Sequence, residues 1–551
     1  MDLFKAKKEE IEGVLKETLK LVQAKGLLQL NEWPTFIVEK PRDKSHGDWA
    51  TNVALLLSKV EKKAPREIAQ IIVNNLCPGI NKLGKTVVAG PGFINFYLEK
   101  DWLVEILPKA IAADEQYGHS NYGQGEKIQV EFVSANPTGL LHMGNARGAA
   151  LGDTLSNLLA AAGYQVTREF YINDAGNQIE NFGKSLEARY LELLGEKVEF
   201  PTEGYHGEDL KQTVAKIIAE VGDTYLNVAP ELRREFLIEK ALTEKLGAIR
   251  EDLKQFGVEY DCWFSEQSLH ESGEIEDCLE RLEDSGVVYE KEGALWLELG
   301  EDKDEVLVRS NGLVTYFAAD IAYHRNKFER GFSKVINIWG ADHHGHVARM
   351  KGAIQALGYD SQRLKIVLMQ LVHLWRGGQR IKMSKRSGTY ITLAELIAEV
   401  GRDAARFFFV MRSPDSHLDF DLDLAREESA ANPVYYVQYA HARIHSILKA
   451  ETCEELQPDF TLLKTEEELA LIEKIAEFPG EIVEAALNCE PHRLTHYAQE
   501  LAALFHSFYN RQRVLVKEPA LRQARLGLID AVRITLRNVL SLLGVSAPER
   551  M

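Results

Sequence analysis

The stretch IQVEFVSANPTGLLHMGNARGAALGD, residues 128–153, indicates the fold of the largest part of this chain. Its first residues form an apolar run typical of a buried strand. A turn containing Pro137 and Gly139 follows, and a helix is expected to open at Gly144, because the next residues are rich in Ala and Leu. We therefore predict a strand, a glycine-containing turn and a helix in succession.

The same succession occurs further along the chain. QVTREFYIND (165–174) has the pattern of a second strand, and the segments KVINIWG (334–340), HVARMKGAIQALG (346–358) and LKIVLMQLVHLW (364–375) have those of strand, helix and strand. Strands that alternate with helices predict an α/β fold with a doubly wound, Rossmann-like parallel sheet, which binds ligands at the carboxyl ends of its strands. We assign this domain to residues 116–424, with a polar, mostly helical insertion at about 192–304.

The two flanks have different patterns. Residues 1–115 predict a small α+β domain, in which Ile11, Leu15 and Leu19 mark an amphipathic helix, 49–60 a second helix, and 86–88 and 93–98 two strands. Residues 425–551 predict an all-α bundle. Its helix candidates are 432–448, 466–478, 492–510 and 521–543.

Composition limits the class of protein. The chain has 551 residues, and its 83 acidic against 65 basic residues give a formal charge of −18. Taken alone, that balance argues against a nucleic-acid partner, although net charge describes the whole surface and a binding face can be a small part of it. The five cysteines form no Cys-x-x-Cys pair, so we predict reduced thiols rather than a disulfide framework or a zinc site. Neither a signal peptide nor an apolar run long enough to cross a bilayer is found in the sequence, and we expect a cytoplasmic protein.

His142, Met143, Gly144 and Asn145 form the first candidate motif. They lie where a helix begins, and a helix N-terminus presents unpaired N–H groups and a partial positive charge to an anion such as a phosphate. The alternative is a helix-entry turn with a capping histidine. Placement alone leaves both interpretations open.

Lys382, Met383, Ser384 and Lys385 form the second candidate motif, within a basic segment that runs from Arg380 to Gly388. Two lysines at this spacing suit successive phosphates of a nucleotide. The alternative is a solvated basic turn.

The two motifs together resemble those of the class I aminoacyl-tRNA synthetases, and the surrounding residues narrow the resemblance to the bacterial type of arginyl-tRNA synthetase. SHGDWATNVAL, VEFVSANPTGLLHMGNARGAALGD, YINDAGNQI, TYFAADIAYH, WGADHH, KMSKRSG and NPVYYVQYAHAR are similar to that family's blocks, in its order. The resemblance implies activation of L-arginine by ATP with Mg²⁺, release of pyrophosphate, and transfer of arginine to the terminal adenosine of tRNA(Arg).

The resemblance also implies site residues. His142, Asn145, Lys382 and Lys385 would be catalytic, and the ATP site would comprise Ala135, Asn136, Pro137, Thr138, Gly139, His142, Met143, Gly144, Asn145, Lys382, Met383, Ser384 and Lys385. The family's first motif usually ends in His, but this chain has Asn145 at that position. The class I synthetase for tryptophan also tolerates Asn there. An amide can still donate a hydrogen bond, but the contribution of an imidazolium is lost.

Arginine selection requires an anionic pocket, because a guanidinium pairs best with a carboxylate. Tyr316 and Asp320 are four residues apart and would share one face of a helix. By the family pattern they face the guanidinium, while Glu131 and Asn136 bind the α-amino and carboxylate groups, with His142 nearby. The structural alternatives are an exposed helix acid for Asp320 and a core aromatic for Tyr316. His343 is assigned to the nucleotide or the substrate rather than to a metal ion, and we predict no structural metal site.

A tRNA ligand requires local basic surface. Basic residues outnumber acidic ones in 376–412 and in 491–551, where Arg533 and Arg537, one helical turn apart, could form a stripe. Tyr435, Tyr436, Tyr439 and Tyr509 offer stacking platforms for bases, although each alone is more simply explained as bundle core. The resemblance assigns the anticodon end to this domain and implies a monomer. Two alternatives remain: a synthetase for another amino acid, and a catalytically impaired tRNA-binding relative, suggested by Asn145.

Overall fold

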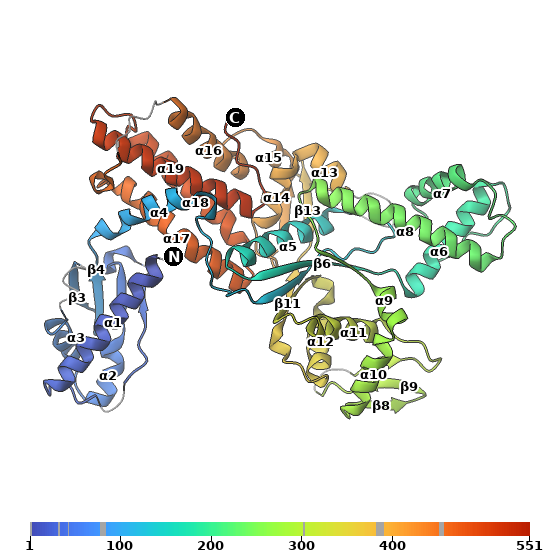
Figure 1. Ribbon diagram of the computed structural model, residues 1–551, viewed down its shortest axis with the longest axis horizontal. Helices are drawn as coiled ribbons and strands as arrows, with labels where there is room; N and C mark the ends of the chain where they lie inside the picture. Colours follow the sequence, from blue (N-terminus) through green and yellow to red (C-terminus); the bar gives the residue numbers. More distant parts are fainter. Residues whose placement is uncertain are drawn as a thin grey trace.

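The computed structural model describes residues 3–30, 33–41, 43–77, 84–300, 304–381, 391–450 and 457–551. Figure 1 shows a central sheet, a C-terminal helical bundle beside it, an N-terminal domain below the bundle, and a helical arm that projects on the opposite side.

The central sheet contains five parallel strands in the order β12-β11-β5-β6-β7. Their bounds are β5 (Lys127–Glu131), β6 (Gln165–Ile172), β7 (Cys262–Ser265), β11 (Lys334–Gly340) and β12 (Leu364–Met369). The chain builds outward from β5 to β7 and then returns to place β11 on the other side of β5. The predicted doubly wound sheet is confirmed, and its order reverses between β5 and β11, the place where such sheets bind ligands.

Helices cover both faces of this sheet. Ile128, Val130 and Phe132 pack in the cluster that contains helix α5 (Met143–Ala161) and the C-terminal helices. Tyr171 and Val335 pack in a second cluster with α11 (Tyr316–Glu329) and α12 (His344–Ala356). Because successive side chains of a strand point to opposite faces, β6 and β11 contribute to both cores.

The region 192–304, predicted as one insertion, is divided by a strand of the central sheet. Helices α6 (Gly176–Leu193), α7 (Glu208–Val221) and α8 (Pro230–Gln255) form the arm. The chain then returns as β7, which pairs with β6, before α9 (Glu266–Ser272), α10 (Glu274–Asp284) and a small antiparallel sheet of β8 (Val288–Lys291), β9 (Ala294–Leu297) and β10 (Glu305–Val308). Four residues, Cys-Trp-Phe-Ser, are too short a run for their pattern to reveal this strand.

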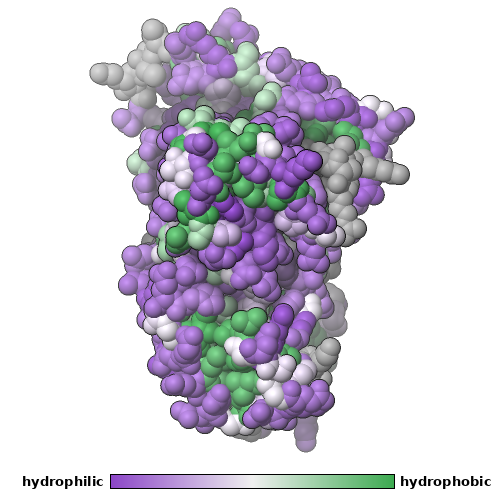
Figure 2. All heavy atoms as spheres, turned by 90° about the vertical axis from the view of Figure 1, so that its right-hand side faces the viewer, coloured by the Kyte–Doolittle hydropathy of each residue, from purple (hydrophilic) through white to green (hydrophobic). Residues whose placement is uncertain are grey.

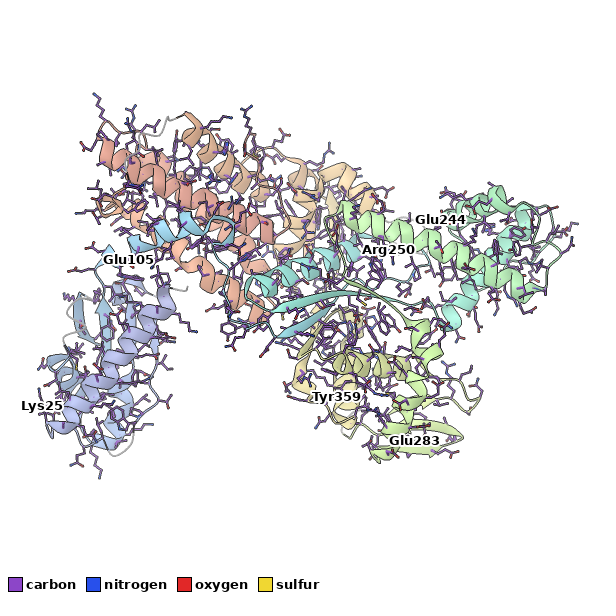
Figure 3. The ribbon with its side chains drawn as sticks, in the orientation of Figure 1. Lys25, Glu105, Glu244, Arg250, Glu283 and Tyr359 are labelled. Carbon is purple, nitrogen blue, oxygen red and sulfur yellow. The ribbon has the colours of Figure 1, made fainter. Side chains whose placement is uncertain are left out.

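The arm has a core of its own, which includes Phe182, Tyr190 and Leu237. Lys216 of α7 and Glu244 of α8 form an ion pair at 2.5 Å, and the Arg250 guanidinium at the base of the arm lies 4.6 Å from the Trp263 ring of β7 (Figure 3). The arm also exposes Leu193, Val198 and Leu232. Figure 2 shows hydrophobic patches among hydrophilic atoms on this side of the molecule.

Residues 364–375, predicted as one strand, form two. The chain leaves the central sheet after β12, and β13 (Val372–Arg376) enters a second sheet between β14 (Gln379–Ile381) and β15 (Leu418–Asp421). Helices α13 (Leu393–Val400), α14 (Arg402–Val410) and α15 (Leu422–Arg426) accompany it. An apolar run predicts burial but not a change of sheet.

The N-terminal domain places α1 (Leu3–Ala24), α2 (Val53–Glu61) and α3 (Pro65–Asn74) on a sheet of order β1-β2-β4-β3. The strands are β1 (Val38–Glu39), β2 (Trp49–Thr51), β3 (Lys85–Ala89) and β4 (Phe93–Tyr97). The α+β prediction is confirmed. The predicted helix at 49–60 is wrong at its start, because Trp49–Thr51 pairs with β4.

The C-terminal domain contains α16 (Pro433–Ala450), α17 (Glu466–Asn488), α18 (His492–Arg511) and α19 (Pro519–Leu542), one for each helix predicted there. Helix α4 (Ile106–Ala113) packs against α19. Helix α17 continues beyond Phe478 through Pro479. Short 3-10 turns lie at 44–46, 100–105, 114–116, 341–343, 361–363 and 460–462. Of the helices in the described ranges, none combines the length and apolar character required to span a membrane.

Helix α5 lies close to β5 because a glycine faces the strand. A Cβ added at Gly152 would lie 2.1 Å from Cγ of Phe132, whereas one at Gly148 would lie 3.7 Å from the Met369 side chain, an ordinary contact. We predict that Gly152→Ala lowers the free energy of unfolding by about 1–3 kcal/mol, measured by urea denaturation. Gly148→Ala is the control, and it should be neutral or stabilising because Ala favours helix. Equal stability of the two variants would contradict this packing.

Candidate active site

The candidate site lies at the carboxyl edge of the central sheet. β5 and β11 are neighbours there, and each leads to a helix, α5 from β5 and α12 from β11. The first predicted motif lies at the start of α5, and His343 lies at the start of α12. Two helix N-termini therefore open at the reversal of the sheet, an arrangement suited to an anion.

The first motif forms a reciprocal cap on α5. The Nδ1 atom of His142 accepts hydrogen bonds from the backbone N–H of Gly144 at 3.1 Å and of Asn145 at 3.4 Å, and the Asn145 Oδ1 atom accepts from the His142 N–H at 3.1 Å. The neutral imidazole must therefore carry its proton on Nε2. The capping interpretation of His142 is confirmed, and it leaves the Nδ2 group of Asn145 as a donor.

The turn between β5 and α5 has an unusual backbone. Val133 and Ser134 have φ values of 69° and 38°, in the left-handed region that β-branched residues rarely adopt. Hydrogen bonds hold the turn, because the Ser134 hydroxyl donates to Glu131 Oε1 at 2.8 Å and accepts from the Tyr171 N–H at 3.2 Å. Strain of this kind is concentrated at functional sites.

Acidic side chains follow three neighbouring strands at this edge: Glu131 at the end of β5, Asp174 after β6 and Glu266 after β7. Asp320, in the first turns of α11, interacts with this group, because the negative charges of Glu131 and Glu266 raise its pKa. The Ser265 hydroxyl donates to Asp174 at 2.6 Å. Together they form an anionic cluster at the carboxyl edge of the sheet, which suits a cationic ligand.

Two of these carboxyl groups have strongly raised pKa values. Burial raises the pKa of Asp320 to about 7, and the negative charges of Glu131 and Glu266 add to that effect. Burial also raises the pKa of Glu266 to about 7, with a further contribution from Asp174. Carboxyl groups whose pKa values are raised by burial and by a nearby charge are typical of functional sites.

Tyr316 and Asp320 share one face of α11, as predicted. Tyr316 is 43% exposed and is therefore no core aromatic, while Asp320 is half-buried and is no exposed acid. The Tyr316 ring lies beside Gly176 at the start of α6, where an added Cβ would be 3.3 Å from it. The Asn136 amide donates to Gln178 of α6 at 2.8 Å, so α6 forms a wall of the pocket.

The other predicted residues are distributed as follows. Ala135, Thr138 and Gly139 are half-buried and Pro137 is buried in the turn before α5, and Met143 and Gly144 lie in its first turn. His343 is well exposed, and its ring centre lies 6.2 Å from that of Trp339. Lys382, Met383, Ser384 and Lys385 lie outside the described residues. The described chain resumes next to the first motif, where Leu393 N–H donates to Leu141 O at 2.9 Å.

Sequence reasoning missed Glu266 and Lys327. Glu266 follows β7, which lay hidden in the predicted insertion. Lys327 is fully buried on α11 and pairs with Glu131 at 2.5 Å. Its signal was the spacing of Tyr316, Asp320 and Lys327, which puts all three on one helix face. Among the described residues, no group of three or more His, Cys, Asp or Glu side chains is placed to bind a metal ion.

The C-terminal helices carry an aromatic surface. Tyr439 is 38% exposed and Tyr435, Tyr436 and Tyr509 are half-buried, so the core interpretation is wrong for Tyr439. The Arg443 guanidinium lies 4.1 Å from the Tyr509 ring centre. A cavity of about 480 Å³ next to them is lined by Ile447, Tyr509, Asn510, Arg511, Gln512, Arg513, Val514 and Leu515.

The predicted arginine stripe on α19 is matched by acids. Arg533 pairs with Asp530 at 2.7 Å and Arg537 with Asp114 at 2.8 Å. Arg406 is fully buried and pairs with Asp153 at 2.5 Å. These arginines therefore serve internal contacts, and the count of basic residues overstates the charge offered to phosphates.

Comparison with known proteins agrees with this architecture. Residues 8–98 match the family described as arginyl tRNA synthetase N terminal domain, 106–444 that of tRNA synthetases class I (R), catalytic domain, and 437–551 that of the DALR anticodon binding domain. The chain is 60% identical to the arginine–tRNA ligase of Moorella thermoacetica and 59% identical to that of Desulfitobacterium hafniense, over all of each chain. The Thermus thermophilus arginyl-tRNA synthetase structure aligns with a TM-score of 0.75, over 99% of this chain and 100% of that one, at 24% identity.

The reciprocal cap predicts a stability effect at Asn145. Asn145→Ala removes the acceptor of the His142 N–H and should lower the free energy of unfolding by about 1 kcal/mol in urea denaturation. Asn145→Gln is the control, because a Gln amide at this helix position can still accept that bond. The cap would be refuted if the alanine variant unfolded at the same urea concentration as the parent.

Proposed function

Because the chain belongs to the arginyl-tRNA synthetase family, we propose that it activates L-arginine with ATP and transfers it to tRNA(Arg) through the site at the reversal of the sheet. The observation that carries this proposal is the cluster of Asp320, Glu266 and Glu131, which lies at the same carboxyl edge of the sheet as two helix N-termini. A guanidinium suits the pocket and a triphosphate suits the helix N-termini.

The first step is an attack of the arginine carboxylate on the α-phosphorus of ATP, which forms arginyl-adenylate and releases pyrophosphate. The second step is attack by the 2′-hydroxyl of the terminal adenosine of the tRNA on the arginyl carbonyl, which releases AMP. Phosphoryl chemistry of this kind needs positioning and positive charge more than covalent help.

In this proposal the first motif binds ATP, and the second motif stabilises the pyrophosphate that leaves. The Nε2–H of His142, the Nδ2 group of Asn145 and the N-terminal amides of α5 bind ATP, which arrives with Mg²⁺. Ala135, Asn136, Pro137, Thr138 and Gly139 shape the turn against it, and Lys382 and Lys385 stabilise the departing pyrophosphate, flanked by Met383 and Ser384.

The amino acid lies along one face of α11. Asp320 and Tyr316 bind the guanidinium, with Glu266 as a second carboxylate. Glu131 binds the α-amino group, and Asn136 the carboxylate that attacks ATP. His343 approaches from α12 at the nucleotide side. Support comes from the depth gradient of α11, along which Tyr316 is exposed, Asp320 half-buried and Lys327 buried.

The tRNA is bound by the two outer domains. Residues 1–115 contact the body of the tRNA, and the surface of Tyr435, Tyr439, Arg443 and Tyr509 takes bases of the anticodon loop. Parallel rings at 6.3 Å in the Tyr435–Tyr439 pair and a neighbouring cavity suit stacking of unpaired bases. The chain works in the cytoplasm, and it works as a monomer. Sedimentation at micromolar concentration tests the monomeric state.

Aminoacylation of tRNA across the amino acids tests the proposed function. Arginine should be charged and the other amino acids should not. ATP–pyrophosphate exchange with arginine, run with tRNA(Arg) present, separates the two alternatives. Charging of another amino acid would identify a different synthetase, and tRNA binding without exchange would identify an impaired relative.

The raised pKa of Asp320 predicts a pH dependence of arginine use. Below about pH 7 the free Asp320 is protonated, so arginine must displace a proton, and KM for arginine should rise as the pH falls from 8 to 6. Asp320→Asn should raise KM by about 100-fold or more at pH 8 and flatten this profile. Glu283→Gln, an exposed change on α10 far from the pocket (Figure 3), is the control.

The same group predicts an opposite effect on stability. The folded pKa of Asp320 lies above the unfolded value of 3.8, so the folded state holds a proton that the unfolded state loses between about pH 4 and 7. Its ionisation therefore destabilises the free protein as the pH rises. Without arginine at pH 8, Asp320→Asn should unfold at a higher urea concentration than the parent. A lower midpoint would refute the assignment of Asp320 to an anionic pocket that awaits a cation.

The aromatic surface predicts a loss of tRNA affinity. Tyr439→Ala should weaken binding of tRNA(Arg) by about tenfold, because one stacked base contributes about 1–3 kcal/mol. Filter binding at several salt concentrations measures this effect, and affinity should fall steeply with salt in every variant. Tyr122→Ala, which removes another exposed tyrosine outside the C-terminal helices, should bind like the parent. Equal loss in both variants would contradict the assignment.

A further inference from the structure

Behind the amino-acid pocket, a chain of buried polar groups crosses from β5 to α11. Lys327 Nζ donates to Glu131 Oε2 at 2.5 Å and to Asn337 Oδ1 at 3.0 Å. Asn337 and Glu131 are direct neighbours in the parallel pairing of β11 with β5. The Lys327 side chain has no solvent exposure and also lies 4.1 Å from the Tyr323 ring centre.

The chain continues from Asn337 to the other end of the pocket. Asn337 Nδ2 donates to His324 Nε2 at 2.7 Å, and His324 Nδ1 donates to the backbone oxygen of Asp320 at 2.7 Å. These two bonds fix the histidine as the neutral Nδ1–H tautomer. Burial and the nearby Lys327 charge lower the pKa of His324 to about 3, in agreement with a neutral ring.

The residues on this path follow the spacing of one helix face. Asp320, His324 and Lys327 are at i, i+4 and i+7 of α11, so one rigid element carries both Asp320 and the lysine that binds Glu131. Glu131 is held on its two oxygens, by Lys327 on Oε2 and by Ser134 on Oε1. It is thus fixed in place relative to Asp320.

Buried ion pairs are rarely needed for stability, since apolar side chains of similar volume are often as stable or more stable. The pair of Lys327 with Glu131 therefore calls for another explanation. A buried carboxylate that is balanced by one ammonium behind it still has lone pairs for a second cation in front. Glu131 is the last residue of β5 and so lies at the carboxyl edge of the sheet.

We propose that Lys327 is a positioning residue that orients and balances Glu131 so that it binds the α-ammonium group of arginine, and that the link through Asn337 and His324 fixes its separation from Asp320. This inference rests on the proposed amino-acid pocket. It adds that recognition of the α-amino end depends on Lys327, which touches no substrate atom.

Two arginine analogues separate this role from a structural one. Agmatine keeps the amino and guanidinium groups of arginine but lacks its carboxylate, and δ-guanidinovaleric acid lacks the amino group. Their inhibition constants are measured against arginine in tRNA-dependent pyrophosphate exchange by the full chain. Lys327→Met should raise the inhibition constant of agmatine and KM for arginine by about tenfold or more, because a charge-assisted hydrogen bond is lost. The constant for δ-guanidinovaleric acid should change less than about twofold, since the guanidinium contacts remain.

Arg325→Met is the matched control. Arg325 is also a buried cation of α11, but it pairs with Asp277 and Glu329 on the other side of the helix. This variant should lose stability and leave the ratio of the two inhibition constants unchanged. Equal weakening of both analogues by Lys327→Met, or no weakening of agmatine, would overturn the proposal.

A second variant covers the case in which Lys327→Met does not fold. Asn337→Ala keeps the ion pair and breaks the link to His324, so it should raise the agmatine constant by a few-fold and leave that of δ-guanidinovaleric acid unchanged. An unchanged agmatine constant in this variant would refute the link. If the unmodified protein showed no arginine-dependent exchange, the proposed function would be refuted. That result would be seen before any variant is compared, so it differs from a failure of the Lys327 proposal.

Discussion

The parallel pairing of β5 with β11 is the constraint on which the site depends. It places Glu131 beside Asn337 and brings the carboxyl ends of two strands together at the point where the sheet order reverses. The helices that follow these strands start at the same edge, so two N-termini open next to the same carboxylate. The α5 end of this arrangement depends on Gly152, since any larger residue would separate the helix from Phe132.

This edge keeps opposite charges apart over a short distance. The helix N-termini present positive potential, which suits phosphates, while Asp320, Glu266 and Glu131 present negative potential, which suits a guanidinium or an ammonium group. Concentrating carboxylates in a half-buried pocket destabilises the free protein, which is evident in the raised pKa values of Asp320 and Glu266. Lys327 offsets part of that repulsion through its ion pair with Glu131, and in the proposed function the cationic substrate offsets the rest.

The sequence predicts those parts of the fold in which local pattern and tertiary role agree. The strand, turn and helix at 127–161 follow from an apolar run, Pro137, Gly139 and a helix-forming segment, and the Tyr316–Asp320 pair follows from a spacing of four. β7 could not be predicted, because its four residues gain strand structure only by pairing with β6. Glu266 was missed for the same reason, because it directly follows β7. The split at Gln370 was hidden for the same reason, since both halves of 364–375 are apolar and only their partners differ. The spacing puts Lys327 on the same helix face as Tyr316 and Asp320, but its neighbours in sequence do not show whether its ammonium group is buried or solvated.

The charge of the chain shows the same limit on a larger scale. A formal charge of −18 describes the whole surface. The local excess of basic residues in 376–412 and 491–551 predicted positive faces of the kind that tRNA binding requires. Yet Arg406, Arg525, Arg533 and Arg537 all form ion pairs with acids of the same chain, and the pairs of Arg406 and Arg525 are buried. A carboxylate partner offsets the positive charge that an arginine presents to a phosphate. The number of unpaired cations available to a phosphate is therefore smaller than the count of basic residues in the sequence. In the proposed function, exposed rings such as Tyr439 beside Arg443 add stacking of unpaired bases to these fewer phosphate contacts, and stacking does not depend on the net charge of the chain.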